Sequence, residues 1–397
     1  MAPERVAYIA QGELFAGPVD GPLDEVPTKF VDQYVERSRR SQARNAWKFE
    51  QRDQAFLGGA MLWGGGASQH VSKPAVVSAA RGRRPGELIY VVQAERVSSV
   101  FANTWTDATL DREAEVRLSS HNDLSLLDIA AHPDGELIAC SVLDGSGAAH
   151  LAVTDDEGRH LRTITEGDSE DLSPRWHPRI PRTLVYQSAG IARSPEDVFM
   201  GFGPSCIEQL KLDTAAIDTL VEDADHDCFA PTFGADDALF YLRRPHHPIG
   251  KGASFGASLT DAFLAPFRIV LAGAAFLGVF AARYGKSLSK NSDEELARMQ
   301  HIAARRRVSA VPMHRAYTGR PSGRDEDDPW RVPVEWKLMR RRPGGEDEVV
   351  AERVLDYDHT TSGAIVYTDG KSLLLRTEDG ATKTLAEKPG MQRVVTL

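Results

Sequence analysis

The chain of 397 residues has few cysteines, few lysines and no apolar segment long enough to read as a membrane span. Its three cysteines, Cys140, Cys206 and Cys228, are odd in number and widely spaced, which excludes a disulfide framework and a CxxC pair. The N-terminal residues lack a basic stretch followed by an apolar core, so no secretory signal is visible. These absences lead us to expect a cytoplasmic protein, and the excess of arginine over lysine is typical of a GC-rich bacterial genome.

The net charge of −10 conceals a strongly basic segment. Residues 262–324 contain eleven Arg and Lys but only three acidic residues, which leaves this segment at +8. A basic segment in an acidic protein indicates an anionic partner, a membrane surface, or docking onto the acidic body of the same chain. The apolar content of 42% is too high for a disordered protein.

Short β-type runs, separated by turn residues, repeat along most of the chain. Gly86-Glu87-Leu88-Ile89 returns as Gly135-Glu136-Leu137-Ile138, and Ser173-Pro174-Arg175-Trp176 and Ala230-Pro231-Thr232-Phe233 each precede another apolar run. The continuations predict four antiparallel strands per repeat, which is the layout of a propeller blade. The last residues, 392–397, would complete a blade begun by residues 5–16. We therefore expect a single all-β domain over 1–397, a six-bladed β-propeller closed by its terminal strands, with five or seven blades also possible.

The Pro-Asp-Gly turn at Pro133-Asp134-Gly135 and the Ser-Pro-x-Trp-x-Pro motif at 173–178 resemble the TolB-like, WD-repeat-like β-propellers. The resemblance covers roughly residues 70–245 and 334–397 together with the first strands. It implies the propeller fold and says little about function, because propellers carry unrelated activities. The Gly-His and Trp-Asp signatures of true WD40 repeats are absent, and so is the α/β domain that precedes the propeller in TolB.

A first insertion is expected in blade one over residues 18–70. Pro27-Thr28 is typical of a helix start, and an apolar stripe follows at helical spacing, comprising Phe30, Val31, Tyr34 and Val35. Arginines then replace the apolar residues, at Arg37, Arg39, Arg40 and Arg44. Either the helix packs on the side of the propeller, with Trp47 and Trp63 as anchors, or its arginine face is a docking surface.

A second insertion, 246–333, is expected to interrupt blade five between its second and third strands. Residues 262–282 are apolar apart from Arg268, and a second helix is predicted at 293–307. Three interpretations stay open: a helical hairpin that caps the propeller, a site that receives a partner protein, and a membrane-surface attachment. The candidate partner-binding residues are the phenylalanines of the apolar helix and a run of arginines that would steer an acidic partner, namely Phe263, Phe267, Phe276, Phe280, Arg305, Arg306 and Arg307.

Motifs for catalysis fail on their context. Gly252-Ala253-Ser254-Phe255-Gly256 matches G-x-S-x-G but follows a loop and not a strand, and Gly285-Lys286-Ser287 lacks the first glycine of a phosphate loop. No catalytic residue and no cofactor is predicted. Nucleic-acid binding is not expected, because aromatic residues are not interleaved with the charges of the basic segment.

The weak candidates for a metal site are Asp225 and Asp227. Their segment fails as a calcium loop, since Cys228 stands where glycine is required. Acidic residues near other inner strands, around 168–171 and 356–359, could converge with them at a channel mouth and bind a cation or a basic peptide. The simpler interpretation is that these Asp and His residues form turns.

Taken together, the sequence predicts a non-enzymatic scaffold or adaptor that recruits a protein partner through 246–333 and the loop faces. A peripheral membrane protein and a hydrolase or metal enzyme at the channel mouth are the alternatives. The oligomeric state is left open.

Overall fold

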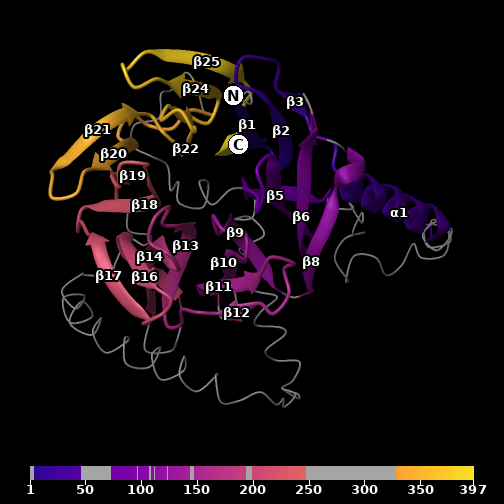
Figure 1. Cartoon of the computed structure of the whole chain (residues 1–397). Helices are drawn as coiled ribbons and strands as arrows, with labels where there is room; N and C mark the ends of the chain where they lie inside the picture. The colour runs from indigo at the N-terminus through magenta and orange to yellow at the C-terminus, as the bar shows by residue number, and fades with distance from the viewer. Residues whose placement is uncertain are drawn as a thin grey trace, which may run out of the picture.

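The structure is a computed structural model, and it describes residues 4–45, 73–95, 97–106, 109–110, 112–122, 124–143, 147–193, 199–246, 328 and 330–397. The described chain is almost entirely β-structure, with one α-helix and one short 3-10 helix. Figure 1 shows the sheets arranged around a common centre, with the two chain ends side by side. The predicted all-β class is confirmed, and the radial arrangement of small antiparallel sheets is that of a β-propeller.

The first sheet joins the two ends of the chain. The C-terminal strand pairs antiparallel with the first strand, and Val6 faces Thr396. Its strand order is β26 (Met391–Thr396), β1 (Arg5–Ala10), β2 (Glu13–Pro18) and β3 (Asp24–Glu25). The predicted pairing of the termini is therefore present.

The second sheet follows the segment that contains α1 (Lys29–Asn45). Both β7 and β8 pair with β6, and the 3-10 helix η1 (Arg112–Ala114) lies between them in sequence. Its strands are β4 (Ala75–Arg81), β5 (Glu87–Ala94), β6 (Val97–Thr106), β7 (Thr109–Leu110) and β8 (Val116–Asn122).

The third sheet has nine strands, held together at one point by a single parallel residue pair, Ala149 with Glu170. On one side of that point lie β9 (Ser125–Ala131), β10 (Leu137–Leu143), β11 (Ala149–Asp155) and β12 (Arg162–Thr163). On the other side lie β13 (Ser169–Trp176), β14 (Thr183–Arg193), β15 (Phe199–Phe202), β16 (Cys206–Lys211) and β17 (Ala216–Val221).

Two four-stranded sheets complete the ring. One runs in the order β18 (His226–Phe233), β19 (Leu239–Pro245), β20 (Lys337–Arg341) and β21 (Asp347–Glu352). The other runs in the order β22 (Asp356–His359), β23 (Ile365–Thr368), β24 (Ser372–Arg376) and β25 (Thr382–Glu387). The pairing of β19 with β20 joins strands that are far apart in the sequence, since Arg243 pairs with Lys337, 94 residues later. 

The repeated turn motif has a common conformation. Gly86 and Gly135 have φ of +73° and +81°, a region that glycine enters without steric cost. The Gly135 amide donates to the His132 carbonyl over 2.8 Å, and the Asp134 side chain accepts from the Glu136 amide over 2.9 Å. The sequence Pro-Asp-Gly therefore fixes the reversal between β9 and β10.

The hydrophobic core is divided into clusters that lie between neighbouring sheets. Each cluster is built from alternate residues of the middle strands, because successive side chains of a strand point to opposite faces. Buried residues from neighbouring sheets that share a cluster include Ile9 with Tyr90, Val91 with Ile138, Val185 with Tyr241, Leu242 with Tyr357, and Tyr8 with Val366. Within the nine-stranded sheet, Ala139 and Trp176 share another cluster across the single parallel pair. This interleaving of apolar faces holds the sheets to one another around the ring.

Candidate functional site

The innermost strands of the sheets bring charged residues to the centre of the ring. Strand β26 contacts β4 and β22, β4 contacts β9, β9 contacts β13, and β13 contacts β18. Three charged residues lie in the middle or at the start of these strands: Asp128 in β9, Asp356 in β22 and Arg393 in β26. They form the axial cluster.

Arg393 is the hub of the axial cluster. Its guanidinium forms an ion pair with Asp128, and Nη1 lies 3.6 Å from Oδ1 of Asp356. The three side chains are between 4% and 15% exposed. Burial lowers the pKa of Arg393 to about 10, so the guanidinium stays charged at neutral pH. Such buried charges are tolerated only while they are paired.

The Asp356 side chain also binds the backbone of the C-terminal strand. Its Oδ2 accepts a hydrogen bond of 2.7 Å from the Val394 amide. Two residues later, Asp358 Oδ2 accepts from the Thr396 amide over 2.8 Å, and Arg81 of β4 donates to the Thr396 carbonyl over 3.2 Å. Side chains from the two neighbouring strands β22 and β4 therefore hold β26, the strand that closes the ring.

Asp356 is also a group that titrates near neutral pH. Its complete burial raises its pKa from the ordinary value near 3.8 to about 7, with the Val394 amide and Arg175 acting against the rise. The carboxyl group therefore changes charge within the physiological range, while it sits against Arg393.

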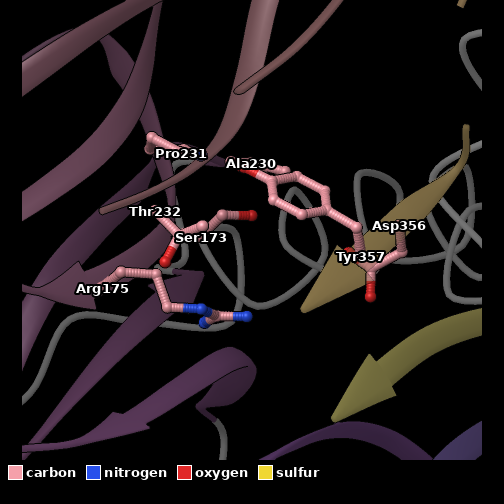
Figure 2. Close-up of a pocket in the computed structure, with 7 residues that line it drawn as sticks. All are labelled: Ser173, Arg175, Ala230, Pro231, Thr232, Asp356 and Tyr357. Carbon is pink, nitrogen blue, oxygen red and sulfur yellow. The ribbon is translucent and has the colours of Figure 1, made fainter. Parts of the chain in front are cut away.

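A small cavity of about 10 Å³ adjoins the axial cluster. Figure 2 shows the guanidinium of Arg175 extending from β13 toward Asp356 and Tyr357 on the opposite side. The cavity is lined by Ser173, Arg175, Ala230, Pro231, Thr232, Asp356 and Tyr357. Its volume is enough for about one water molecule. It therefore does not offer room for a substrate.

The cavity owes its shape to two bulged strands. Ser173 and Ala230 have φ of 52° and 49°, each directly before a proline, at register shifts in β13 and β18. These are uncommon conformations for residues other than glycine, and they occur at bulges that redirect the following side chains. The Tyr357 hydroxyl ties the two sides together by donating to the Ala230 carbonyl over 2.9 Å.

A second buried ionic group lies where the 246–333 segment leaves and re-enters the described chain. Asp227 accepts from Arg244 Nε over 3.1 Å, and its other oxygen lies 2.7 Å from His246 Nδ1. The Arg244 guanidinium also lies over the rings of Trp336, at 4.6 Å, and Phe229, at 5.0 Å. We call these five residues the insertion base.

The insertion base is built from both sides of the inserted segment. Arg244 and His246 precede the segment, whereas Trp336 follows it and packs edge-on against Phe229 at 5.6 Å between ring centroids. Burial opposes ionisation of Asp227, but the hydrogen bond from His246 and the charge of Arg244 hold its pKa below the ordinary range. The ionised carboxylate fixes the two residues at which the chain departs.

The two weak candidates for a metal site, Asp225 and Asp227, are engaged in other contacts. Asp227 is committed to Arg244 and His246, and Asp225 takes part in a local turn in which its amide donates to Asp223 Oδ1 over 2.9 Å. In the described ranges no group of three or more His, Cys, Asp or Glu is arranged to hold a metal ion. The acidic residues near the inner strands do not converge there: Asp356 and Asp358 bind β26, while Asp171 accepts from the Ser188 hydroxyl.

The predicted partner-binding residues Phe263, Phe267, Phe276, Phe280, Arg305, Arg306 and Arg307 lie outside the described residues, as do Ser254 and the Gly285-Lys286-Ser287 motif. The helix predicted to start at Pro27-Thr28 is present as α1. Within the part of the chain that the structure describes, no helix is long and apolar enough to cross a bilayer.

Sequence reasoning missed the axial cluster and the role of Arg244. A signal was present: Asp128 is the one polar residue of Leu126–Ala131, and Arg393 is the one charged residue of Met391–Val395. A single charge inside a buried strand needs a partner, so both residues could have been marked as paired, although not with which partner.

No family model matches the chain, and no curated protein matches it. Among solved structures it is similar to TolB from Acinetobacter baumannii, with 11% identity and a TM-score of 0.52 over 99% of this chain and 66% of the TolB chain. It is also similar to a nidogen/laminin complex, with 8% identity and a TM-score of 0.49 over 99% and 98%, and to a TolB from Agrobacterium tumefaciens, with 12% identity and a TM-score of 0.41 over 81% and 84%. The chain thus spans slightly less than two thirds of the Acinetobacter TolB. The resemblance to TolB-like propellers is confirmed for the fold alone.

Proposed function

We propose that this chain is a six-bladed, TolB-like propeller that acts as a non-enzymatic scaffold, and that it recruits a protein partner through the 246–333 segment and the loops beside it. The blade count rests on the strand order. If the nine-stranded sheet is divided at its single parallel pair, Ala149 with Glu170, every group contains an inner strand followed by antiparallel partners. The groups then begin at β26, β4, β9, β13, β18 and β22.

The observation that carries the scaffold proposal is the insertion base. When a long segment interrupts two paired strands, bringing its ends together costs conformational entropy, and this cost grows with the length of the segment. If its ends were not held, the segment could also move freely relative to the sheet. Here Arg244, two residues before the segment, is held by Asp227 and lies over the rings of Phe229 and Trp336, and Trp336 follows the segment by three residues. A segment anchored in this way is presented from a fixed place on a rigid body, as a partner-binding element requires.

The axial cluster is a second observation that supports the scaffold proposal. The charged side chains of the axial cluster are bonded to one another, and the adjoining cavity has room for about one water. Side chains that are committed to each other in this way serve the structure of the ring, which favours the loop faces as the place for binding.

The test uses three baits in native lysate: the full chain, a variant with 247–327 replaced by a short Gly/Ser linker, and Arg84→Glu as a matched surface control. Circular dichroism and the midpoint of thermal unfolding establish that all three are folded. We expect a protein that is recovered in stoichiometric amount by the full chain and by the control, and is lost with the linker variant. Recovery of the same proteins by all three baits, or of none, would contradict the proposal. Binding of the full chain to anionic vesicles without any protein partner would favour the membrane alternative instead.

A further inference from the structure

Helix α1 is fixed at its N-terminal end by a partly buried contact to the second sheet. The two carboxylate oxygens of Glu115 accept from the amides of Lys29 and Phe30 over 3.1 Å and 3.0 Å, and Glu115 also accepts from the Tyr90 hydroxyl over 2.6 Å. The first amides of a helix have no partner within it, so Glu115 supplies the missing acceptors. Phe30 packs against Phe101 at 5.1 Å between ring centroids.

The remainder of α1, residues 36–45, projects away from the sheets, as Figure 1 shows. We call these residues the arm. Arg37, Arg39, Arg40, Ala43 and Arg44 are exposed, and the one ion pair of the arm among the described residues joins Arg40 to Glu36 over 2.7 Å. A short helix segment that has a single ion pair and no packing partner among the described residues is marginal in water. A partner bound to its exposed face would therefore stabilise the arm.

The exposed surface of the arm is a row of arginines. Arg37, Arg40 and Arg44 stand at i, i+3 and i+7, so they share one face of the helix over a length of about 10 Å. Arg37, Arg39 and Arg44 make no ion pair with any described residue. The arm carries four arginines and one glutamate, a net charge of +3, whereas the chain as a whole carries −10.

We propose that the arm binds an acidic segment of a protein partner through these arginines. The planar guanidinium group pairs with carboxylates in a bidentate manner, which suits a row of Asp or Glu side chains. The arm and 246–333 are separate segments of the sequence, and the variants that test the two proposals are different, so each proposal can fail without the other.

Other polyanions fit the arm less well. Its aromatic neighbours Phe30 and Tyr34 are turned toward the second sheet and are half-buried, which leaves no exposed ring for stacking on bases. A long nucleic acid would also approach the acidic remainder of the chain. A membrane-surface helix needs large apolar residues opposite its charges, and the arm has none.

The experiment measures binding of fluorescein-labelled decaglutamate to the full chain by fluorescence anisotropy, at about 20 mM salt, where the Debye length is roughly 20 Å. We compare the unaltered protein with Arg37→Glu/Arg44→Glu and with the control Arg84→Glu/Arg117→Glu. The control changes two other exposed arginines that form no ion pair with described residues, and it alters the net charge equally. We expect the arm variant to weaken binding by about tenfold or more and the control to change it by about twofold or less.

Hydrogen exchange supplies a second readout that does not depend on net charge. Saturating decaglutamate should slow exchange of the amides of residues 38–45 in the unaltered protein and leave them unchanged in the arm variant. Equal weakening by both variants, or no peptide binding by the unaltered protein, would overturn the proposal. Tighter binding of a short DNA duplex or of phosphatidylserine vesicles than of the peptide, lost in the arm variant, would also overturn it.

Discussion

Replacement of Arg393 by methionine should destabilise the ring more than any ordinary surface change. The substitution keeps most of the side-chain volume but removes the charge between Asp128 and Asp356, both of which remain buried. Removing one partner of a buried ion pair costs about 3–5 kcal/mol, because the remaining charge has lost its compensation. For a chain of 397 residues, an unfolding entropy of about 2.1 cal/mol/K per residue makes 1 kcal/mol correspond to roughly 1.2 °C in the unfolding midpoint, so we expect a fall of about 4–6 °C.

The pH dependence of this loss tests its electrostatic cause. Protonation of Asp356 removes one of the two uncompensated charges, so Arg393→Met should lose less stability at pH 5 than at pH 8. The assay is the thermal unfolding midpoint across this range, with Arg84→Met as the control, for which a change within about 0.5 kcal/mol is expected. A second variant, Arg393→Met/Asp128→Asn, should recover part of the loss. A loss below about 1 kcal/mol, or a further loss in the double variant, would refute the assignment of Arg393 as the hub.

Three further predictions follow from named contacts. Because burial raises the pKa of Asp356 to about 7, the folded chain holds a proton that the unfolded chain releases, and this group makes the stability fall as the pH rises from about 4 toward 7. Asp356→Asn should remove that contribution, so the unfolding midpoint of the variant should rise relative to that of the unaltered protein between pH 5 and pH 8. A difference between the two midpoints that stays constant over this range would contradict the raised pKa. Trp336→Ala removes a ring that packs on Phe229 and Arg244, so it should lower the free energy of unfolding by about 3–5 kcal/mol, measured by thermal unfolding. A loss below about 1 kcal/mol would show that the insertion base is not rigid. Glu115→Ala leaves the first amides of α1 without their acceptors, so it should speed hydrogen exchange in residues 30–36 and lower the free energy of unfolding by about 1–2 kcal/mol. Unchanged exchange would exclude Glu115 as the helix cap.

The propeller could be predicted from the sequence because most strands pair with the next strand along the chain and because the pattern of strands and turns repeats. A turn such as Pro133-Asp134-Gly135 indicates a reversal between adjacent strands, and other turn residues, such as Pro85-Gly86 and Ser362-Gly363, mark the reversals of other repeats. The pairing of the two chain ends was also accessible, because residues 392–397 and 5–16 each form an incomplete repeat. Helix α1 was accessible from the spacing of Phe30, Val31 and Tyr34.

The axial cluster could not be predicted from these local patterns. Asp128 and Arg393 are separated by 265 residues, and nothing in either strand indicates which charge stands across the ring. The same holds for the insertion base, in which Arg244 meets Trp336 only because β19 and β20 pair across the inserted segment. The acidic residues near the inner strands were expected either to converge or to form turns. Asp225 forms a turn, but Asp356 and Asp358 instead hold the closing strand.

The most direct test of the scaffold account is to locate the partner on the chain by chemical cross-linking and mass spectrometry of the complex recovered with the full-length bait. Lysines occur both within 246–333, at Lys251, Lys286 and Lys290, and elsewhere in the chain, at Lys73 before β4, Lys211 in β16 and Lys383 in β25. The account predicts that cross-links to the partner concentrate on the first three lysines and on Lys337 beside the insertion base. Cross-links confined to Lys73, Lys211 and Lys383, or a complex that forms unchanged when 247–327 is replaced by a linker, would contradict it.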